Sequence, residues 1–255
     1  MKFTDTHCHL YSEEFKHDIG NVIARAESEG VGKFYLPGID SSAINDMLQL
    51  EKDFPGKCMA MMGLHPCYVK DNYREELAIV AGWLEKRKFA AVGEIGLDFY
   101  WDKTHVKEQY EAFRMQAQLA LQHQLPIVIH SRDAMDESIA IVKEFSSRGL
   151  KGIFHCFGGT LAQANEIIDL GFYLGIGGVL TYKKSGLAEV LASVSLDHLV
   201  LETDAPYLTP VPFRGKRNES SYLKYVAEQL AAIKKVSLEE LALVTTSNAE
   251  KIFGA

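Results

Sequence analysis

Residues 90–97 read AAVGEIGL, residues 105–124 read HVKEQYEAFRMQAQLALQHQ, and residues 126–132 read PIVIHSR. The first and third segments are short apolar runs rich in strand-forming residues, whereas the segment between them has the character of a helix. Pro126 ends this helix and opens the next strand, because proline disfavours helical geometry at the residue before it. The stretch therefore predicts a strand, a helix and a second strand parallel to the first.

The same alternation of strand and helix recurs along the whole chain. The eight predicted strands are residues 2–9, 33–39, 58–65, 90–97, 126–132, 152–157, 172–177 and 199–204. The predicted helices are residues 13–29, 41–53, 73–88, 105–124, 134–147, 161–170, 185–194, 221–235 and 238–253. Eight such units with short connections predict an α/β protein with the (β/α)8 TIM-barrel fold, for which 255 residues is a usual length.

An open, doubly wound sheet is the competing architecture. It usually carries a glycine-rich phosphate turn after the first strand, but that position reads His7-Cys8-His9-Leu10 here. The chain also shows no internal repeat, low-complexity tract or Pro/Gly/Ser-rich linker. We therefore expect residues 1–255 to form a single barrel domain.

The composition argues against several classes of protein. The net charge of −7 disfavours a broad nucleic-acid-binding surface, which is normally basic, but allows a small site that holds phosphates through metal ions. No apolar run approaches the roughly 18 residues of a membrane helix, and the N-terminus lacks the apolar core of a signal peptide. The four cysteines show no C-x-x-C spacing and are interpreted as thiols. These features predict a cytoplasmic protein without membrane association.

Polar side chains gather at the ends of the predicted strands, where the active site of a parallel barrel forms. Five of the nine histidines lie there together with two carboxylates. Along the chain these residues are His7, His9, His65, Glu94, His130, His155 and Asp204. His7 and His9 are two positions apart, so in a strand both imidazoles face one side while Cys8 faces the other.

This convergence predicts a metal centre, although each residue alone would be weak support for one. Imidazoles and carboxylates are ligands of Zn²⁺, Mn²⁺ or a related ion, and they would be unfavourable to bury together without one. Six ligands are too many for one tetrahedral ion and suit two ions about 3.5–4 Å apart. The predicted ligands are His7, His9 and Asp204 for one ion, His130 and His155 for the other, and Glu94 as the bridge. The imidazoles favour Zn²⁺ or Mn²⁺ over Mg²⁺, which still remains a candidate for supporting activity.

With these residues in place, the chain resembles the TatD-type metal-dependent deoxyribonucleases, which are amidohydrolase-like barrels. The resemblance covers essentially the whole chain. The motifs that carry it are DTHCHL at 5–10, GLHP at 63–66, GEIGLD at 93–98, HSRDA at 130–134, HCF at 155–157, LETDAPYL at 201–208 and PVPFRGKRNE at 210–219. It implies metal ligation by the six residues assigned above and a cation-dependent nuclease, often acting from the 3′ end of DNA. DNA, single-stranded or at a 3′ end, is thus the expected partner, and no obligate protein partner is indicated.

Three positions depart from the pattern of this family. Members commonly have serine where Ala205 stands, histidine where Phe213 stands and proline where Ser220 stands. None of these residues is a predicted ligand. Phe213 lies beside Arg214, a predicted phosphate contact, so this departure bears on substrate preference.

Three of the strand-end residues have predicted catalytic roles. Bound ions would lower the pKa of a water molecule, Asp204 would act as its general base, and Glu94 would hold both ions. His65 has no place in the ligand count, so we expect it to donate to a phosphate oxygen or to the leaving group. The alternative for His65 is a core histidine held by Pro66.

Basic and aromatic residues beyond the strand ends are predicted to bind the substrate. Arg132 follows His130 by two residues, and Arg214 lies in the loop after the eighth strand. Tyr100, within the aromatic run at residues 99–101, is expected to stack on bases. For that aromatic run, and for the charges of Lys216 and Arg217, the alternatives are packing on the barrel rim and plain solvation.

Two other functions remain open at this point. The same dinuclear barrel could act on a small amide, lactone or phosphate ester, because the fold does not determine the chemistry. The fourth strand, however, carries Glu94 and no lysine, whereas some dinuclear amidohydrolases bridge their ions with a modified lysine. A binding module without activity is the second alternative, and the complete ligand set argues against it.

Overall fold

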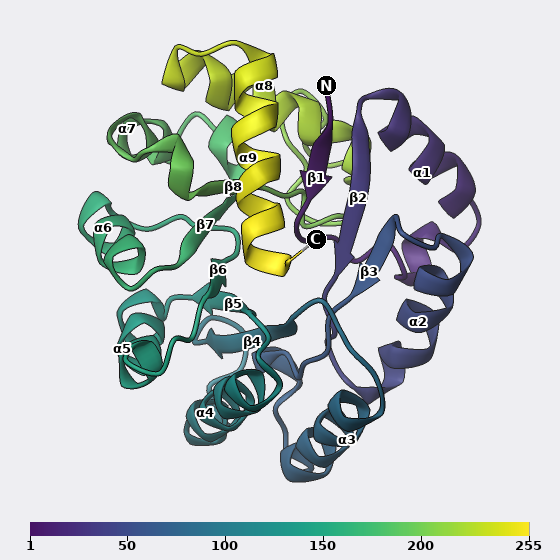
Figure 1. Cartoon of the computed structure of the whole chain (residues 1–255), viewed down its shortest axis with the longest axis vertical. Coiled ribbons are helices and arrows are strands. Elements are labelled where there is room, and N and C mark those ends of the chain that lie inside the picture. The colour runs from purple at the N-terminus through teal and green to yellow at the C-terminus, as the bar shows by residue number, and fades with distance from the viewer. Residues whose placement is uncertain (255) are drawn as a thin grey trace.

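The computed structural model describes residues 1–254, and it confirms the predicted barrel, with central strands surrounded by helices (Figure 1). The strands are β1 Phe3–Asp5, β2 Val31–Leu36, β3 Cys58–Ala60, β4 Val92–Asp98, β5 Ile127–Arg132, β6 Gly152–Phe154, β7 Tyr173–Ile176 and β8 Leu199–Leu201. The helices are α1 Ile19–Ser28, α2 Ile44–Asp53, α3 Tyr73–Lys86, α4 Val106–His123, α5 Met135–Ser146, α6 Leu161–Asp169, α7 Leu187–Ser193, α8 Leu223–Lys234 and α9 Leu238–Phe253. None of these helices has the length and apolar character needed to cross a membrane.

The strands form two parallel arcs that close into one ring. The first arc has the order β1-β2-β3 and the second the order β4-β5-β6-β7-β8. A parallel bridge between Met62 and Val92 joins the arcs on one side. On the other side, the backbone N–H of Thr6 donates to the carbonyl oxygen of Leu201 over 3.0 Å. Because both seams are hydrogen-bonded, the sheet closes on itself as a barrel requires.

The last helix, α9, covers the amino-terminal end of the barrel, where Figure 1 shows it crossing in front of the strands. Its Thr246 bonds to the carbonyl oxygen of Lys2, just before β1, and its Asn248 bonds to that of Leu199 at the start of β8. Phe253 stacks on Tyr35 inside the barrel, with ring centroids 3.7 Å apart. The amino-terminal end is therefore filled with side chains.

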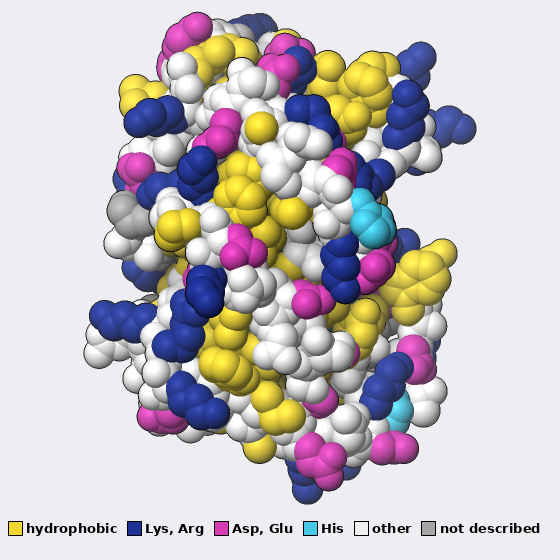
Figure 2. Space-filling view, turned by 90° about the vertical axis from the view of Figure 1, so that its right-hand side faces the viewer, with side chains coloured by type: hydrophobic (Ala, Val, Ile, Leu, Met, Phe, Trp, Pro, Cys, Tyr) yellow, Lys and Arg dark blue, Asp and Glu magenta, His cyan; other side chains and the backbone are white. Residues whose placement is uncertain are grey.

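The opposite end, where the carboxyl ends of the strands lie, is hollowed. Figure 2 shows the molecule from the side of α1 and α2, and its right-hand outline is indented. A cavity of about 840 Å³ opens there, lined by residues that follow strands from both arcs. This is the end at which parallel barrels carry their functional residues.

Several strands end earlier than the sequence pattern predicts. β1 ends at Asp5 instead of residue 9, β3 at Ala60 instead of residue 65, and β8 at Leu201 instead of residue 204. The predicted boundaries were wrong because the last residues of each run turn away from the ladder. Asp204, for example, has a left-handed φ of 56°, a conformation that aspartate tolerates better than most residues. Most candidate ligands thus lie just beyond their strands.

Candidate metal centre

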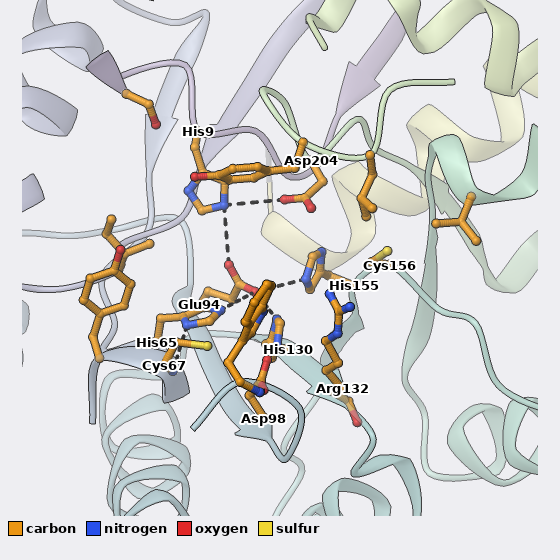
Figure 3. A pocket seen from close by; sticks show the side chains of 18 residues that line it. His9, His65, Cys67, Glu94, Asp98, His130, Arg132, His155, Cys156 and Asp204 are labelled. Carbon is orange, nitrogen blue, oxygen red and sulfur yellow. Dashed lines mark hydrogen bonds and ion pairs between the residues drawn. The ribbon is translucent and has the colours of Figure 1, made fainter. Parts of the chain in front are cut away.

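The predicted ligands meet on the floor of the cavity. Figure 3 shows His9, Glu94, His130, His155 and Asp204 pointing toward one another. His7 is fully buried, with its Nε2 atom 3.3 Å from that of His9. The structure therefore brings all six residues together, as the convergence of strand ends led us to expect.

Glu94, from the middle of β4, divides its two carboxylate oxygens between two groups of imidazoles. Oε2 lies 3.1 Å from Nε2 of His7 and 3.6 Å from Nε2 of His9. Oε1 lies 2.9 Å from Nδ1 of His130 and 3.0 Å from Nε2 of His155. A single buried carboxylate thus divides its two oxygens between two adjacent pairs of imidazoles.

Asp204 completes the first of these sets. Its Oδ1 atom lies 3.6 Å from Nε2 of His7 and 3.5 Å from Nε2 of His9. Its backbone N–H donates to the carbonyl oxygen of His7 over 2.9 Å, which ties the end of β8 to the end of β1. The left-handed backbone at Asp204 therefore turns its side chain toward the first pair of histidines.

The charges of this cluster fit divalent cations. Burial raises the pKa of Glu94, but the surrounding imidazoles, His155 foremost, outweigh it and hold that pKa well below its usual value. Burial lowers the pKa of His155, yet the Glu94 and Glu202 carboxylates raise it well above its usual value. The carboxylates therefore favour positive charge here, which a bound ion would supply. By distance alone, three groups of side chains lie close enough together to hold an ion: His7, His9 and Glu94; His7, His155 and Asp204; and His65, Glu94 and His130.

His65 lies next to the second set but has a different hydrogen-bonding pattern. Its Nε2 atom is 3.3 Å from Oε1 of Glu94. Its Nδ1 atom accepts the backbone N–H of Cys67 over 3.0 Å and so caps the short turn Pro66–Tyr68. An Nδ1 that accepts carries no proton, so in the neutral ring the proton is on Nε2. His65 therefore presents a donor to the cavity.

Two carboxylates that contact the predicted ligands are not among the residues that the sequence patterns singled out. Asp98 Oδ2 lies 2.9 Å from Nε2 of His130, and Glu202 Oε1 lies 3.3 Å from Nδ1 of His155. Asp98 is four residues after Glu94 and Glu202 two before Asp204. The sequence signal that could have revealed Asp98 and Glu202 is that each is a second carboxylate in the same motif as a predicted ligand.

Asp5, the last residue of β1, connects this strand to the segment after β8 through hydrogen bonds. Its carboxylate accepts hydrogen bonds from the backbone N–H and hydroxyl of Thr203, at 3.0 and 2.6 Å, and from the hydroxyl of Ser220 at 2.6 Å. Burial raises the pKa of Asp5 to about 7, although these hydrogen bonds oppose the rise. A proline at position 220, as the family resemblance leads one to expect, could not donate this bond. Ser220 therefore provides Asp5 with a hydrogen bond that a proline side chain could not make.

The aromatic run after β4 packs under a guanidinium group. Arg132 lies 4.1 Å above the ring of Tyr100 and 5.6 Å from that of Trp101, while Phe99 is partly buried against the core. Arg132 and Trp101 line the cavity, and Tyr100 lies beside them, 52% exposed. The two predicted substrate contacts, Arg132 and Tyr100, thus form one stacked unit at the rim.

The loop after β8 contributes to the cavity through its first residues and not through its basic run. Tyr207 and Leu208 line the cavity. Arg214 is exposed outside that lining, with its guanidinium 3.7 Å above the ring of Tyr182. Arg217 binds both oxygens of Asp18, at 2.8 and 2.7 Å, and so ties the loop to the start of α1.

Phe213, at the second position that departs from the family pattern, stacks on Tyr222 with ring centroids 4.5 Å apart. Its ring also lies edge-on to Tyr225, with centroids 5.4 Å apart. Phe213 therefore packs within an aromatic cluster next to α8.

Comparison with known proteins identifies chains that are similar over their full lengths. A family model described as TatD related DNase matches residues 4–254. The metal-dependent hydrolase YabD of Bacillus subtilis strain 168, described as uncharacterized, is 42% identical over 252 residues, covering 98% of this chain and 98% of YabD. The 3′-5′ ssDNA/RNA exonuclease TatD of Erwinia tasmaniensis is 31% identical over 255 residues and 98% of both chains. The crystal structure of YJJV, a TatD homolog of Escherichia coli K12, matches with a TM-score of 0.94 at 31% identity, over 99% of this chain and 98% of YJJV.

Proposed function

Because this chain belongs to the TatD related DNase family and is a metal-dependent hydrolase, we propose that it cleaves phosphodiester bonds of DNA from the 3′ end of a single strand. The reaction would use two divalent ions, Zn²⁺, Mn²⁺ or Mg²⁺, held by the six predicted ligands. The main support is Glu94, whose two oxygens face two adjacent pairs of imidazoles. A shared ligand of this kind suits two ions about 3.5–4 Å apart, the arrangement in which metal ions assist phosphodiester cleavage.

Each side chain at the cavity floor has a role in this proposal. Ions bound there would lower the pKa of a water molecule and neutralise charge that develops on the phosphate. Asp204 is 13% exposed, so its carboxylate reaches both the cavity and the first pair of histidines. It would accept the proton of the attacking water, as a general base within hydrogen-bond reach. His65 would donate its Nε2 proton to a phosphate oxygen or to the leaving group.

The rim of the cavity supports a substrate with unstacked bases. Four aromatic side chains are exposed within residues 1–254, namely Tyr68, Tyr100, Trp101 and Tyr207. Three of them line this cavity, and the fourth, Tyr100, stacks beside it on Arg132. Aromatic stacking contributes about 1–3 kcal/mol per base without sequence preference, and the bases of a single strand are free to stack. Local stacking and metal–phosphate contact would therefore hold DNA despite the net charge of −7.

A substrate comparison tests the proposed function. The purified protein is incubated with 3′-labelled and 5′-labelled single-stranded DNA, duplex DNA, a phosphomonoester and a lactone, each with Mg²⁺, Mn²⁺ or Zn²⁺ and with chelator. We expect single-stranded DNA to shorten from its 3′ end and chelator to stop the reaction. Turnover of the lactone or the phosphomonoester without any effect on DNA would reject the nuclease assignment.

Replacing the rim residue Trp101 with alanine is expected to raise the KM for single-stranded DNA by roughly 5- to 150-fold, which corresponds to the loss of about 1–3 kcal/mol of stacking. The rate constant kcat should change little, because Trp101 is not one of the predicted ligands. Hydrolysis of bis(4-nitrophenyl) phosphate, which has no base, should be unaffected. The matched control is Leu243→Ala, which changes a side chain that is 73% exposed on α9. An unaltered KM for DNA in the Trp101→Ala variant would remove this residue from substrate binding.

A further inference from the structure

Each imidazole of the proposed metal centre has one ring nitrogen that faces the ion position and one that points away from it. The residues that contact the second nitrogen differ from one histidine to the next. A neutral imidazole carries its proton on one nitrogen and binds a metal through the other. A neighbour that engages one nitrogen therefore decides which nitrogen faces the ion, and such neighbours tune metal affinity. Two of these neighbours, Tyr11 and Asp98, lie outside the predicted ligand set.

Tyr11 is buried behind His9. Its hydroxyl donates to the carbonyl oxygen of Pro37 over 2.5 Å, and the same hydroxyl oxygen lies 3.0 Å from Nδ1 of His9. Because its one proton is engaged by Pro37, Tyr11 can only accept from His9. His9 therefore carries its proton on Nδ1, and its Nε2 lone pair faces Asp204 and Glu94, 3.5 and 3.6 Å away.

Asp98 occupies the equivalent place behind His130. Its Oδ2 lies 2.9 Å from Nε2 of His130, and its Oδ1 accepts the backbone N–H groups of Tyr100 and Trp101 at 2.9 Å each. A carboxylate accepts and does not donate, so Nε2 of His130 carries a proton. The other nitrogen, Nδ1, lies 2.9 Å from Oε1 of Glu94, which is itself a predicted ligand. An ion bound between them would displace any proton from Nδ1, whereas Asp98 would keep the proton on Nε2.

His65 shows the opposite arrangement and serves as an internal contrast. The backbone N–H of Cys67 occupies its Nδ1, so the proton lies on the Nε2 that faces Glu94. An imidazole in this tautomer cannot ligate through Nε2. The hydrogen-bond partners thus separate two histidines that present a lone pair to the centre from one that presents a proton.

We propose that Tyr11 and Asp98 are positioning residues for two different ions. Tyr11 sets the affinity for the ion held by His9, and Asp98 sets the affinity for the ion held by His130. The inference rests on the two-ion centre of the proposed function. It adds that the metal affinities of the two positions are set independently, one by the neutral phenol of Tyr11 and the other by the carboxylate of Asp98.

Binding of Zn²⁺ alone to single-ion variants tests the Tyr11 part. The His155→Ala variant retains the position at His9, and the dissociation constant is measured by competition with a chromogenic chelator. Adding Tyr11→Phe is expected to weaken binding by about 10- to 100-fold, because His9 loses the acceptor that fixes its tautomer and ring orientation and raises its basicity. Adding Asp98→Asn instead should leave the dissociation constant unchanged.

The reverse experiment uses the His7→Ala variant, which retains the position at His130. Asp98→Asn should weaken Zn²⁺ binding there by about 100-fold, because the amide donates to Nε2 and forces the proton onto Nδ1, as in other carboxylate–histidine pairs. Tyr11→Phe should have no effect. If either substitution weakens both positions equally, or neither weakens any, the proposal is overturned.

Tyr73→Phe is the matched control, since it removes a largely buried phenol that donates to Glu111 over 2.6 Å, on α3 and α4. It should leave both dissociation constants unchanged. Long-range ¹H–¹⁵N spectra of the zinc-loaded native protein provide a measurement that needs no variant. We expect a proton on Nδ1 of His9 and on Nε2 of His130, and the reverse placement would refute the tautomer assignment.

These measurements separate the inference from the proposed function. They use no nucleic acid, so inactivity toward DNA would reject the nuclease proposal and leave the metal affinities interpretable. A native protein that binds one Zn²⁺ ion only would contradict the two-ion centre and, with it, the independent tuning of two positions.

Discussion

Replacing Asp204 with asparagine is expected to reduce kcat for DNA hydrolysis by roughly 10²–10⁴-fold, the usual contribution of a general acid or base. The amide cannot accept the proton of the attacking water, and it removes the negative charge that faces His7 and His9 at 3.6 and 3.5 Å. Asparagine has the same shape and also tolerates the left-handed backbone at this position. The variant should therefore fold normally.

Three measurements check this expectation: kcat with labelled single-stranded DNA, Zn²⁺ content after dialysis, and the thermal unfolding midpoint. We expect the midpoint to be close to that of the native protein and the second ion, at His130, to be retained. Asp53→Asn is a suitable control, because Asp53 lies at the end of α2 and accepts a hydrogen bond from Gln49 of the same helix. Native kcat in the Asp204→Asn variant would eliminate Asp204 as the general base.

Replacing Glu94 with glutamine should weaken both ions together, each by at least about 100-fold, more than the loss of a residue that only supports a ligand. Its two oxygens lie within 3.1 Å of His7 on one side and within 2.9 Å of His130 on the other, so one substitution affects both sets of donors. Hydrolysis should fall below detection. Glutamine matches the buried side chain in size, so the barrel should remain folded.

The informative comparison for Glu94→Gln is a variant that removes a predicted ligand of one ion and leaves the predicted ligands of the other ion intact. His7→Ala or His9→Ala should empty the first position and leave the position at His130 and His155 at least partly filled. Metal content determined by elemental analysis, in proteins with matched circular dichroism spectra, distinguishes the two patterns. If the Glu94→Gln protein keeps one ion at native affinity, Glu94 does not bridge the two positions.

Much of this site could be predicted from local sequence patterns. Alternation of apolar strands with helices depends on residues close in the chain, and eight such units predict a closed parallel barrel. The carboxyl ends of parallel strands lie at one end of a barrel, so polar residues at those ends must meet. His7, Glu94 and Asp204 could be grouped in this way although up to 197 residues separate them along the chain.

Other features depend on contacts that no local pattern reports. The division of Glu94 between two sets of imidazoles depends on the rotation of one side chain within the assembled barrel. The strand ends were predicted too late, because the backbone leaves the ladder after Asp5, Ala60 and Leu201 without a local signal in the sequence. Arg214 has the positively charged side chain expected of a phosphate contact, but it stacks on Tyr182 outside the cavity lining.

The sequence by itself determined which side chains would meet at the carboxyl end of the barrel, because the order of the strands and the residues that follow them can be read from local patterns. Only the tertiary structure decided how each one is presented. The tautomer inferred for His9 depends on Tyr11 and on the carbonyl oxygen of Pro37, 26 residues beyond Tyr11. Asp5 depends on Ser220, which is 215 residues away. Such hydrogen bonds require the chain to be folded, since their geometry is set by packing between segments that share no local pattern.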